Sequence, residues 1–263
     1  MSGRTLVSRV RAPGLWLLVG VLAGLAMMLP PIAQPPSYHE FADRRACWGL
    51  PHCLDTASNA LFVLAGAVGL WFLRGGSFVP ARRAFIDPRE AWPYRLFFLG
   101  VVLIGFGSGY YHFAPDNARL LWDRLPMMLA FMAWFAAIVC ERVSLRAGLS
   151  LLPLLLVVGL GSVLYWGWSE ARGAGDLRPY LLMQLYPMLL SPLLLRFYPA
   201  RYSGDRDILA IIGLYLLALL FDLGDRPVFA LTGGLVSGHT IKHVIAALAV
   251  VGVALYLRRR QAL

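Results

Sequence analysis

Long apolar blocks separated by short polar segments dominate this sequence, and they restrict what it can fold into. Eight blocks approach the roughly 20 residues that a helix needs to cross a bilayer. They lie near residues 14–33, 56–74, 95–113, 119–140, 148–168, 179–198, 207–223 and 238–257. Hydrophobic residues make up 59% of the 263, which is more apolar surface than one globular core can bury. We therefore predict an all-α, polytopic membrane bundle with an extra N-terminal span.

The first block has features of both a signal peptide and an uncleaved anchor, because the basic segment "MSGRTLVSRVR" precedes it. No clear cleavage site follows, and "LPPIAQPP" is typical of a proline-rich exit from a helix. We expect residues 1–35 to form a cytoplasmic N-terminus and a transmembrane anchor, with residues 36–263 as the main domain.

Basic residues predict the orientation of the bundle. A net charge of +10 would point to nucleic acid in a soluble chain, but here the charges lie in short segments between apolar blocks, so no nucleic-acid partner is expected. With the N-terminus inside, the inner segments hold 16 of the 24 Lys and Arg residues. The positive-inside rule then predicts both termini in the cytoplasm. The residues counted are Arg4, Arg9, Arg11, Arg74, Arg82, Arg83, Arg89, Arg95, Arg142, Arg146, Arg196, Arg201, Arg206, Arg258, Arg259 and Arg260.

Three of the five histidines fall at one membrane level, at the outer ends of the spans. His112 ends the third block, and His239 and His243 begin the eighth in "SGHTIKHVIAALAV". Histidines at i and i+4 project from one helix face and can share an ion. Zinc prefers such nitrogen ligands, and three of them leave a fourth position for water. We predict a zinc site; the alternative is that each histidine only forms hydrogen bonds in the bundle or lies at the interface.

Two further polar residues belong to the same level. Ser108 precedes His112 by one helical turn, and Asp123 lies about one turn into the next block. A carboxylate there can accept a proton from zinc-bound water, although a structural pair with Arg119 or Arg124 is an equally good explanation. No role is expected for His39 and His52, which lie in the outer loop.

Together these residues resemble the alkaline ceramidase family, within the membrane-hydrolase superfamily that also holds the adiponectin and progestin receptors. The resemblance rests on Ser108 and His112, on Asp123 eleven residues later, and on the late pair His239 and His243. The stretch "DTASNALFVLAGAVGLW" is also similar to the family's first core span. The resemblance covers roughly residues 40–257. It implies a seven-helix core formed by the second to eighth blocks, and the extra first span and short tail are typical of a bacterial member.

The family implies an amidase that splits the N-acyl bond of ceramide-like lipids into a sphingoid base and a fatty acid. On this resemblance His112, His239 and His243 match the zinc ligands, Ser108 the active-site serine and Asp123 the catalytic carboxylate. The residues themselves favour Ser108 as an oxyanion donor or a partner of the zinc water rather than a nucleophile. The N-terminal calcium-binding pattern of eukaryotic members is not matched, so calcium is doubtful.

The expected partners are therefore ceramide-like or other N-acyl lipids and the surrounding membrane lipids. The expected location is the bacterial inner membrane, with the site toward the periplasm. A non-enzymatic zinc-bearing receptor or scaffold is the main alternative, and a transporter is the second. A transporter predicts polar residues in both halves of the bundle, whereas those identified here gather at the outer end.

Secondary expectations concern residues around this site. Asp222 or Asp225 can orient a ligand histidine, and Lys242 is expected to point to another face of its helix. Cys47 and Cys53 can pair in an oxidising compartment, with free thiols as the alternative. The aromatic residues near the outer ends are expected to form an interfacial belt: Tyr110, Tyr111, Trp122, Trp166 and Trp168.

Overall fold

Helices supply the regular structure. The computed structural model describes residue 17 and residues 20–75 and 84–263. In these residues the named elements are all helices, and strand-like pairing is limited to two isolated bridges. The all-α prediction is therefore confirmed. The elements are η1 (Pro36–His39), α2 (Cys53–Ala57), α3 (Ala60–Leu73), η3 (Pro88–Glu90), α4 (Ala91–Phe113), α5 (Asn117–Arg142), α6 (Leu145–Ala171), α7 (Arg178–Phe197), α8 (Asp205–Leu223), α9 (Asp225–Leu231) and α10 (Gly238–Arg259).

The predicted blocks two to eight coincide with these helices. Six spans are long and apolar enough to cross a membrane, and α8 with α9 makes a seventh if this pair, bent by 78°, counts as one. α2 and α3 together form the first of the six. Part of the predicted N-terminal span lies outside the described residues, and residues 20–28 of that span are helical. Five of the counted arginines also lie outside the described residues: Arg4, Arg9, Arg11, Arg82 and Arg83.

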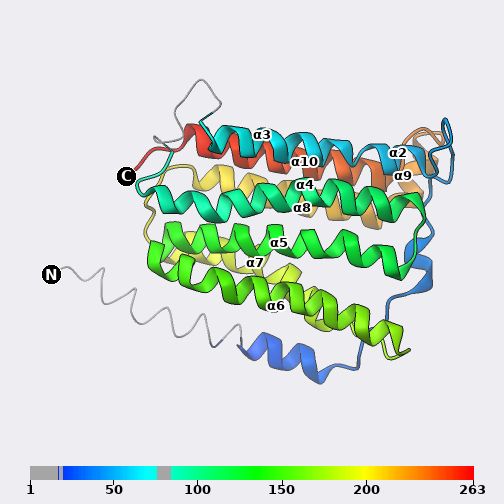
Figure 1. Cartoon of the computed structure of the whole chain (residues 1–263), viewed down its shortest axis with the longest axis horizontal. Coiled ribbons are helices and arrows are strands. Elements are labelled where there is room, and N and C mark those ends of the chain that lie inside the picture. The colour runs from blue at the N-terminus through cyan, green and yellow to red at the C-terminus, as the bar shows by residue number, and fades with distance from the viewer. Residues whose placement is uncertain (1–16, 18–19, 76–83) are drawn as a thin grey trace.

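The long helices lie side by side with their axes along the longest dimension of the molecule (Figure 1). α5 packs against α4 on one side and α6 on the other, while α10 contacts both α3 and α8. Small residues allow the closest approaches, as is common between membrane helices. At Gly107 on α4, an added Cβ would lie only 2.1 Å from the backbone oxygen of Trp122 on α5. This contact brings the C-terminal part of α4 and the N-terminal part of α5 together, next to His112 and Asp123.

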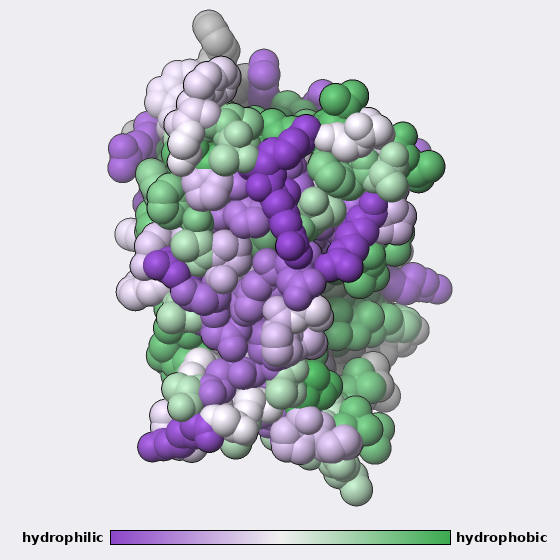
Figure 2. Space-filling view, turned by 90° about the vertical axis from the view of Figure 1, so that its right-hand side faces the viewer, coloured by the Kyte–Doolittle hydropathy of each residue, from purple (hydrophilic) through white to green (hydrophobic). Residues whose placement is uncertain are grey.

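The sides of the bundle and the end that holds the histidines differ in polarity. Along the sides of the bundle large apolar side chains are exposed, including Leu154, Val157 and Leu164 on α6. Such a surface is suited to lipid tails rather than water. Figure 2 views the end of the bundle that lies at the right of Figure 1, and hydrophilic residues gather over its centre. This polar end carries α2, α9 and the start of α10 (Figure 1).

Candidate metal centre

A buried group of three histidines lies at the polar end of the bundle. His112 comes from the last turn of α4, and His239 and His243 come from the first two turns of α10. One ligand atom from each lies within 4.8 Å of the others, and the exposed fractions of the residues are 1%, 4% and 2%. The structure thus brings together the three predicted ligands in a group that could hold a metal ion.

The spacing of the ring nitrogens fits a small cation. His112 Nε2 and His239 Nε2 are 3.1 Å apart. Two nitrogens bound to one tetrahedral zinc at about 2.05 Å would be about 3.3 Å apart, so little movement is needed. A proton shared between the two rings would give a similar distance. His243 extends the group to three rings, with centroids 4.7 Å from His239 and 5.1 Å from His112.

Hydrogen bonds on the far side of two rings direct their Nε2 lone pairs inward. His239 Nδ1 lies 2.7 Å from Asp222 Oδ1, which can only accept when ionised. His243 Nδ1 lies 2.8 Å from Ser58 Oγ, and that hydroxyl donates to the carbonyl oxygen of Asp55. Ser58 is therefore left to accept from the ring. Both contacts assign the proton to Nδ1 and leave Nε2 free for a metal, the usual arrangement around ligand histidines.

The bend between α8 and α9 positions this outer layer of contacts. Asp222 lies in the last turn of α8, and Asp225 begins α9. Asp225 Oδ1 accepts from the His239 backbone N–H at 2.9 Å, while Ser237 caps α10 by accepting from Thr240 N–H at 2.8 Å. The bend thus fixes where α10 begins. Of the two acids proposed as histidine partners, Asp222 holds the ring and Asp225 holds the backbone.

The loop at residues 40–52 covers the group. Phe41 packs with its ring centroid 4.6 Å from those of both His112 and His239. A disulfide joins Cys47 to Cys53, so these two cysteines do pair. Burial alone would raise the pKa of Asp43, but hydrogen bonds and charge from Arg45 outweigh it and lower the pKa. Ala42, the next residue after Phe41, donates its backbone N–H to Asp225 Oδ2 at 2.8 Å, and this bond ties the loop to the start of α9 beside the histidines.

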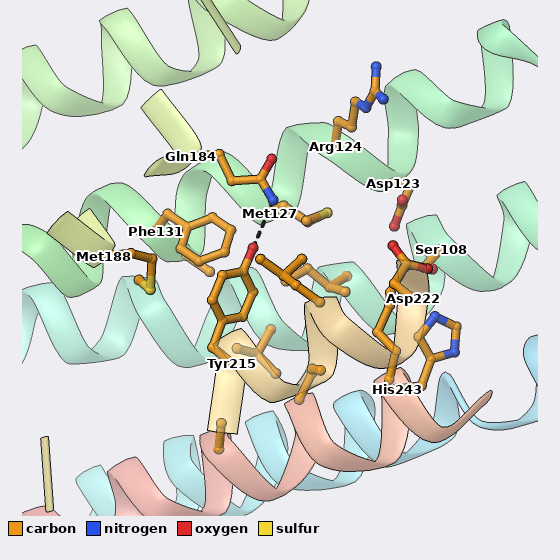
Figure 3. A pocket seen from close by; sticks show the side chains of 18 of the residues that line it. Ser108, Asp123, Arg124, Met127, Phe131, Gln184, Met188, Tyr215, Asp222 and His243 are labelled. Carbon is orange, nitrogen blue, oxygen red and sulfur yellow. Dashed lines mark hydrogen bonds and ion pairs between the residues drawn. The ribbon is translucent and has the colours of Figure 1, made fainter. Parts of the chain in front are cut away.

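Ser108 and Asp123 meet beside His243. Their side chains interact, and Figure 3 shows Asp123 pointing from α5 toward Ser108 and Asp222. The structural alternative for Asp123, a pair with a nearby arginine, is not what the contacts favour. Arg119 pairs with Asp116, and Arg124 donates to Gln34.

A cavity of about 480 Å³ opens from this point into the bundle. Ser108, Asp123 and His243 line one part of it, while apolar residues such as Ile211 and Val250 line the membrane-embedded part. Its volume falls within the range usual for pockets that enclose small ligands. Gln184 donates to Tyr215 at 2.7 Å on the cavity wall (Figure 3).

Three expectations about neighbouring residues were wrong. Lys242 does not point to a different face of α10 from the histidines. It lies at i+3 from His239, and its long side chain places Nζ 3.2 Å from Asp222 Oδ1 and 3.4 Å from His239 Nε2. Tyr111 and Trp166 are not interfacial, since they are 1% and 0% exposed and pack inside the bundle. Helix boundaries predicted only to within a few residues do not determine which side of a helix faces its neighbours.

The other three residues of the expected aromatic belt, Tyr110, Trp122 and Trp168, are exposed in the half of the bundle that holds the histidines. His39 lies outside the histidine group and contacts Tyr111 and Asn117, both at 2.9 Å. Ser58 lies in the stretch that resembles the first core span of the ceramidase family. Its contact with His243 could not be predicted, because that contact depends on how the helices pack and no local sequence pattern indicates it.

No protein-family model matches the chain, and no curated protein is significantly similar to it. The case for a function therefore rests on the geometry of this site.

Proposed function

We propose that this protein is a zinc-dependent intramembrane amidase that hydrolyses the N-acyl bond of ceramide-like lipids. The observation that carries the proposal is the juxtaposition of a buried three-histidine group with Ser108 and Asp123 at one end of an apolar cavity. A metal-ligand set without a cavity would fit a structural site, and an apolar cavity without the polar group would fit lipid binding alone. The combination favours hydrolysis of a bond within a lipid.

The cavity is suited to an amide with long apolar substituents. Its membrane-embedded walls can take hydrocarbon chains, and its polar end lies at the outer ends of α4, α5 and α10. A lipid bound with its tails inward would present its head-group region to His243, Asp123 and Ser108. An N-acyl linkage occupies this boundary between head and tails.

Each side chain has a distinct part in the proposed reaction. A zinc ion bound by His112, His239 and His243 would supply Lewis acidity and lower the pKa of a water to about 7. Asp123 accepts the proton of the attacking water and passes it to the leaving amine. Ser108 donates a hydrogen bond to the oxygen that becomes negative as the carbonyl is attacked. Burial by Phe41 and the outer loop keeps bulk water from weakening these interactions.

The orientation proposed for this site is outward, toward the periplasm of a bacterial inner membrane. The Cys47–Cys53 disulfide beside the histidines supports an oxidising side. At the opposite end lie basic residues such as Arg142, Arg146 and Arg258, the pattern expected for the cytoplasmic side.

The proposal predicts that Asp123→Asn loses about 10²-fold or more of the amidase rate while keeping its metal, because it removes only the proton acceptor. Ser108→Ala should lose about 10²- to 10³-fold and also keep metal. The assay follows release of fatty acid from an N-acylated sphingoid base in detergent, with metal content measured on the same samples.

Asp116→Asn is the matched control. Asp116 caps α5 at the same end of the bundle, and asparagine also caps helices well, so its rate should match that of the unmodified protein. Near-normal turnover by metal-loaded Asp123→Asn would contradict the mechanism.

A further inference from the structure

Arg124 brings a buried positive charge to the wall of the cavity, one residue after Asp123 on α5. Figure 3 shows the two side chains leaving the helix in different directions, with Arg124 pointing away from Ser108. The residue is only 4% exposed and lines the cavity together with Gln34 and Tyr38. It therefore marks a part of the cavity that the proposed hydrolysis does not use.

The guanidinium of Arg124 makes only some of the hydrogen bonds that it can donate. Its Nη2 donates to Gln34 Oε1 at 2.6 Å, but Nε and Nη1 are buried with no hydrogen-bond partner among the described residues. Aromatic faces surround it: the guanidinium carbon lies 4.2 Å from the ring centroid of Trp166 and 4.6 Å from that of Tyr180. Aromatic faces offset part of the cost of burying a cation, yet they accept none of its remaining in-plane hydrogen bonds.

Nearby carboxylates are engaged elsewhere. Glu170 Oε1 accepts from the backbone N–H of Gln34 at 2.6 Å and from Trp166 Nε1 at 3.2 Å. Asp123 faces Ser108 and attracts Arg124 only at longer range, without forming an ion pair with it among the described residues. Within the described part of the chain, Arg124 thus forms no ion pair. A buried, unpaired charge in a membrane protein is costly, so its position on a cavity wall calls for an anion from outside the chain.

We propose that Arg124, with Gln34 beside it, binds an anionic head group of the lipid substrate, such as a phosphate or sulfonate. The neighbouring cavity wall is mainly apolar, which favours a lipid over a free inorganic anion. With its tails in the apolar part, a lipid would place its linkage near Asp123 and His243 and its head group near Arg124. The inference deepens the proposed function by naming the substrate as an anionic N-acyl lipid.

The test measures binding rather than turnover, so it stays informative if the proposed amidase activity fails. The probes are a two-chain ether lipid with a free hydroxyl head group and the same lipid phosphorylated at that hydroxyl; neither contains an amide. Affinity is measured for the full chain in neutral detergent. The phosphorylated lipid should bind about 10- to 100-fold more tightly, the range expected for hydrogen bonds between charged partners.

Three substitutions separate charge recognition from structure. Arg124→Gln should abolish the preference by lowering affinity for the phosphorylated lipid to about that for the hydroxyl lipid, and Arg124→Lys should keep part of the preference. Arg172→Gln is the matched control, because Arg172 also lies over a tryptophan, 4.0 Å from the Trp168 ring centroid, but does not line the cavity. It should keep the full preference.

Several results would overturn the inference. Equal affinity of the unmodified protein for both lipids would exclude a head-group site. An equal loss for both lipids in Arg124→Gln would make Arg124 structural. Displacement of the phospholipid by inorganic phosphate at similar affinity would indicate a free-anion site, and equally strong Arg124-dependent binding of a fatty acid would indicate a site for the acid product.

Discussion

Ser58 shows how a hydroxyl outside the histidine motifs can orient a ring of the candidate metal centre. It lies at the junction of α2 and α3, accepts from His243 Nδ1 and donates to the Asp55 carbonyl. This chain of two hydrogen bonds fixes the ring's tautomer as well as its orientation. Asp222 does the same for His239 with a carboxylate.

We therefore predict that Ser58→Ala weakens metal affinity about 10- to 100-fold without unfolding the protein, the usual effect of removing such a partner. The measurement is competition with a chelator. Ser162→Ala is the control: that hydroxyl is also buried but donates only to the Gly159 carbonyl of its own helix. Unchanged affinity in Ser58→Ala would mean that other contacts hold the ring.

At the residue level, the sequence predicted that the three histidines would come together, but it predicted only part of their surroundings. The i, i+4 spacing of His239 and His243 is a local signal, and the ends of two apolar blocks put His112 at the same depth. The contact between Ser58 and His243 joins residues 185 positions apart, so only the packed bundle determines it. The guanidinium of Arg124 among buried aromatic rings is likewise a product of packing.

Among the elements, the bend of α8 into α9 does most to shape the site. It turns the chain by 78° at Gly224, so that Asp222 and Asp225 both reach the first turn of α10. The start of α10 must lie very close to the bend between α8 and α9 to make these contacts. An added Cβ on Gly238 would lie 2.2 Å from the Phe221 backbone oxygen and 2.7 Å from Asp225 Cα.

Gly238→Ala should consequently force α10 away from the bend, lowering the free energy of unfolding by about 1–3 kcal/mol and reducing metal occupancy. Gly161→Ala is the control, because Gly161 lies within α6 with no atom near the added Cβ. That change should be neutral or stabilise the helix by up to about 1 kcal/mol. Thermal unfolding in detergent tests both, and equal behaviour of the two variants would contradict the proposed contact.

Helix positions could be predicted well because apolar blocks of membrane length are a strong signal. The predicted seventh block at 207–223 agrees with α8, Asp205–Leu223. The seven-residue helix α9 lies between two predicted blocks, in "DRPVFALTGG", which is short and contains a proline, so no span was expected there. A helix this short is marginal in isolation, and α9 contacts its neighbours α8 and α10.

At the scale of the whole molecule, the two ends of the bundle carry different charge clusters. The end opposite the histidines holds a buried ion pair between Arg260 and Glu141, and Glu141 also accepts from Tyr94 at 2.6 Å and Tyr256 at 2.7 Å. This cluster ties the last residues of α10 to α4 and α5. The prediction that polar residues gather at one end alone was thus too narrow, because the histidines lie at one end and this cluster at the other.

The proposed orientation predicts opposite labelling of the two ends of α6. Ala174→Cys lies just beyond its outer end and Arg146→Cys in its first inner turn, and both positions are exposed. In intact cells, a membrane-impermeant thiol reagent should label the cysteine at 174 and leave the one at 146 unlabelled until the membrane is opened. The reverse pattern would place the metal centre on the cytoplasmic side.

Metal content per chain is the most direct measurement of the central claim, that His112, His239 and His243 together hold one zinc ion. Elemental analysis of the protein purified without added chelator should give about one zinc per chain, and His112→Ala or His239→Ala should lose most of it. His52→Asn is the matched control, since His52 lies at the same end, hydrogen-bonds the Asp43 backbone and has φ of 46°, which asparagine tolerates. It should keep its zinc. Full zinc occupancy in a folded variant lacking all three histidines would contradict the account.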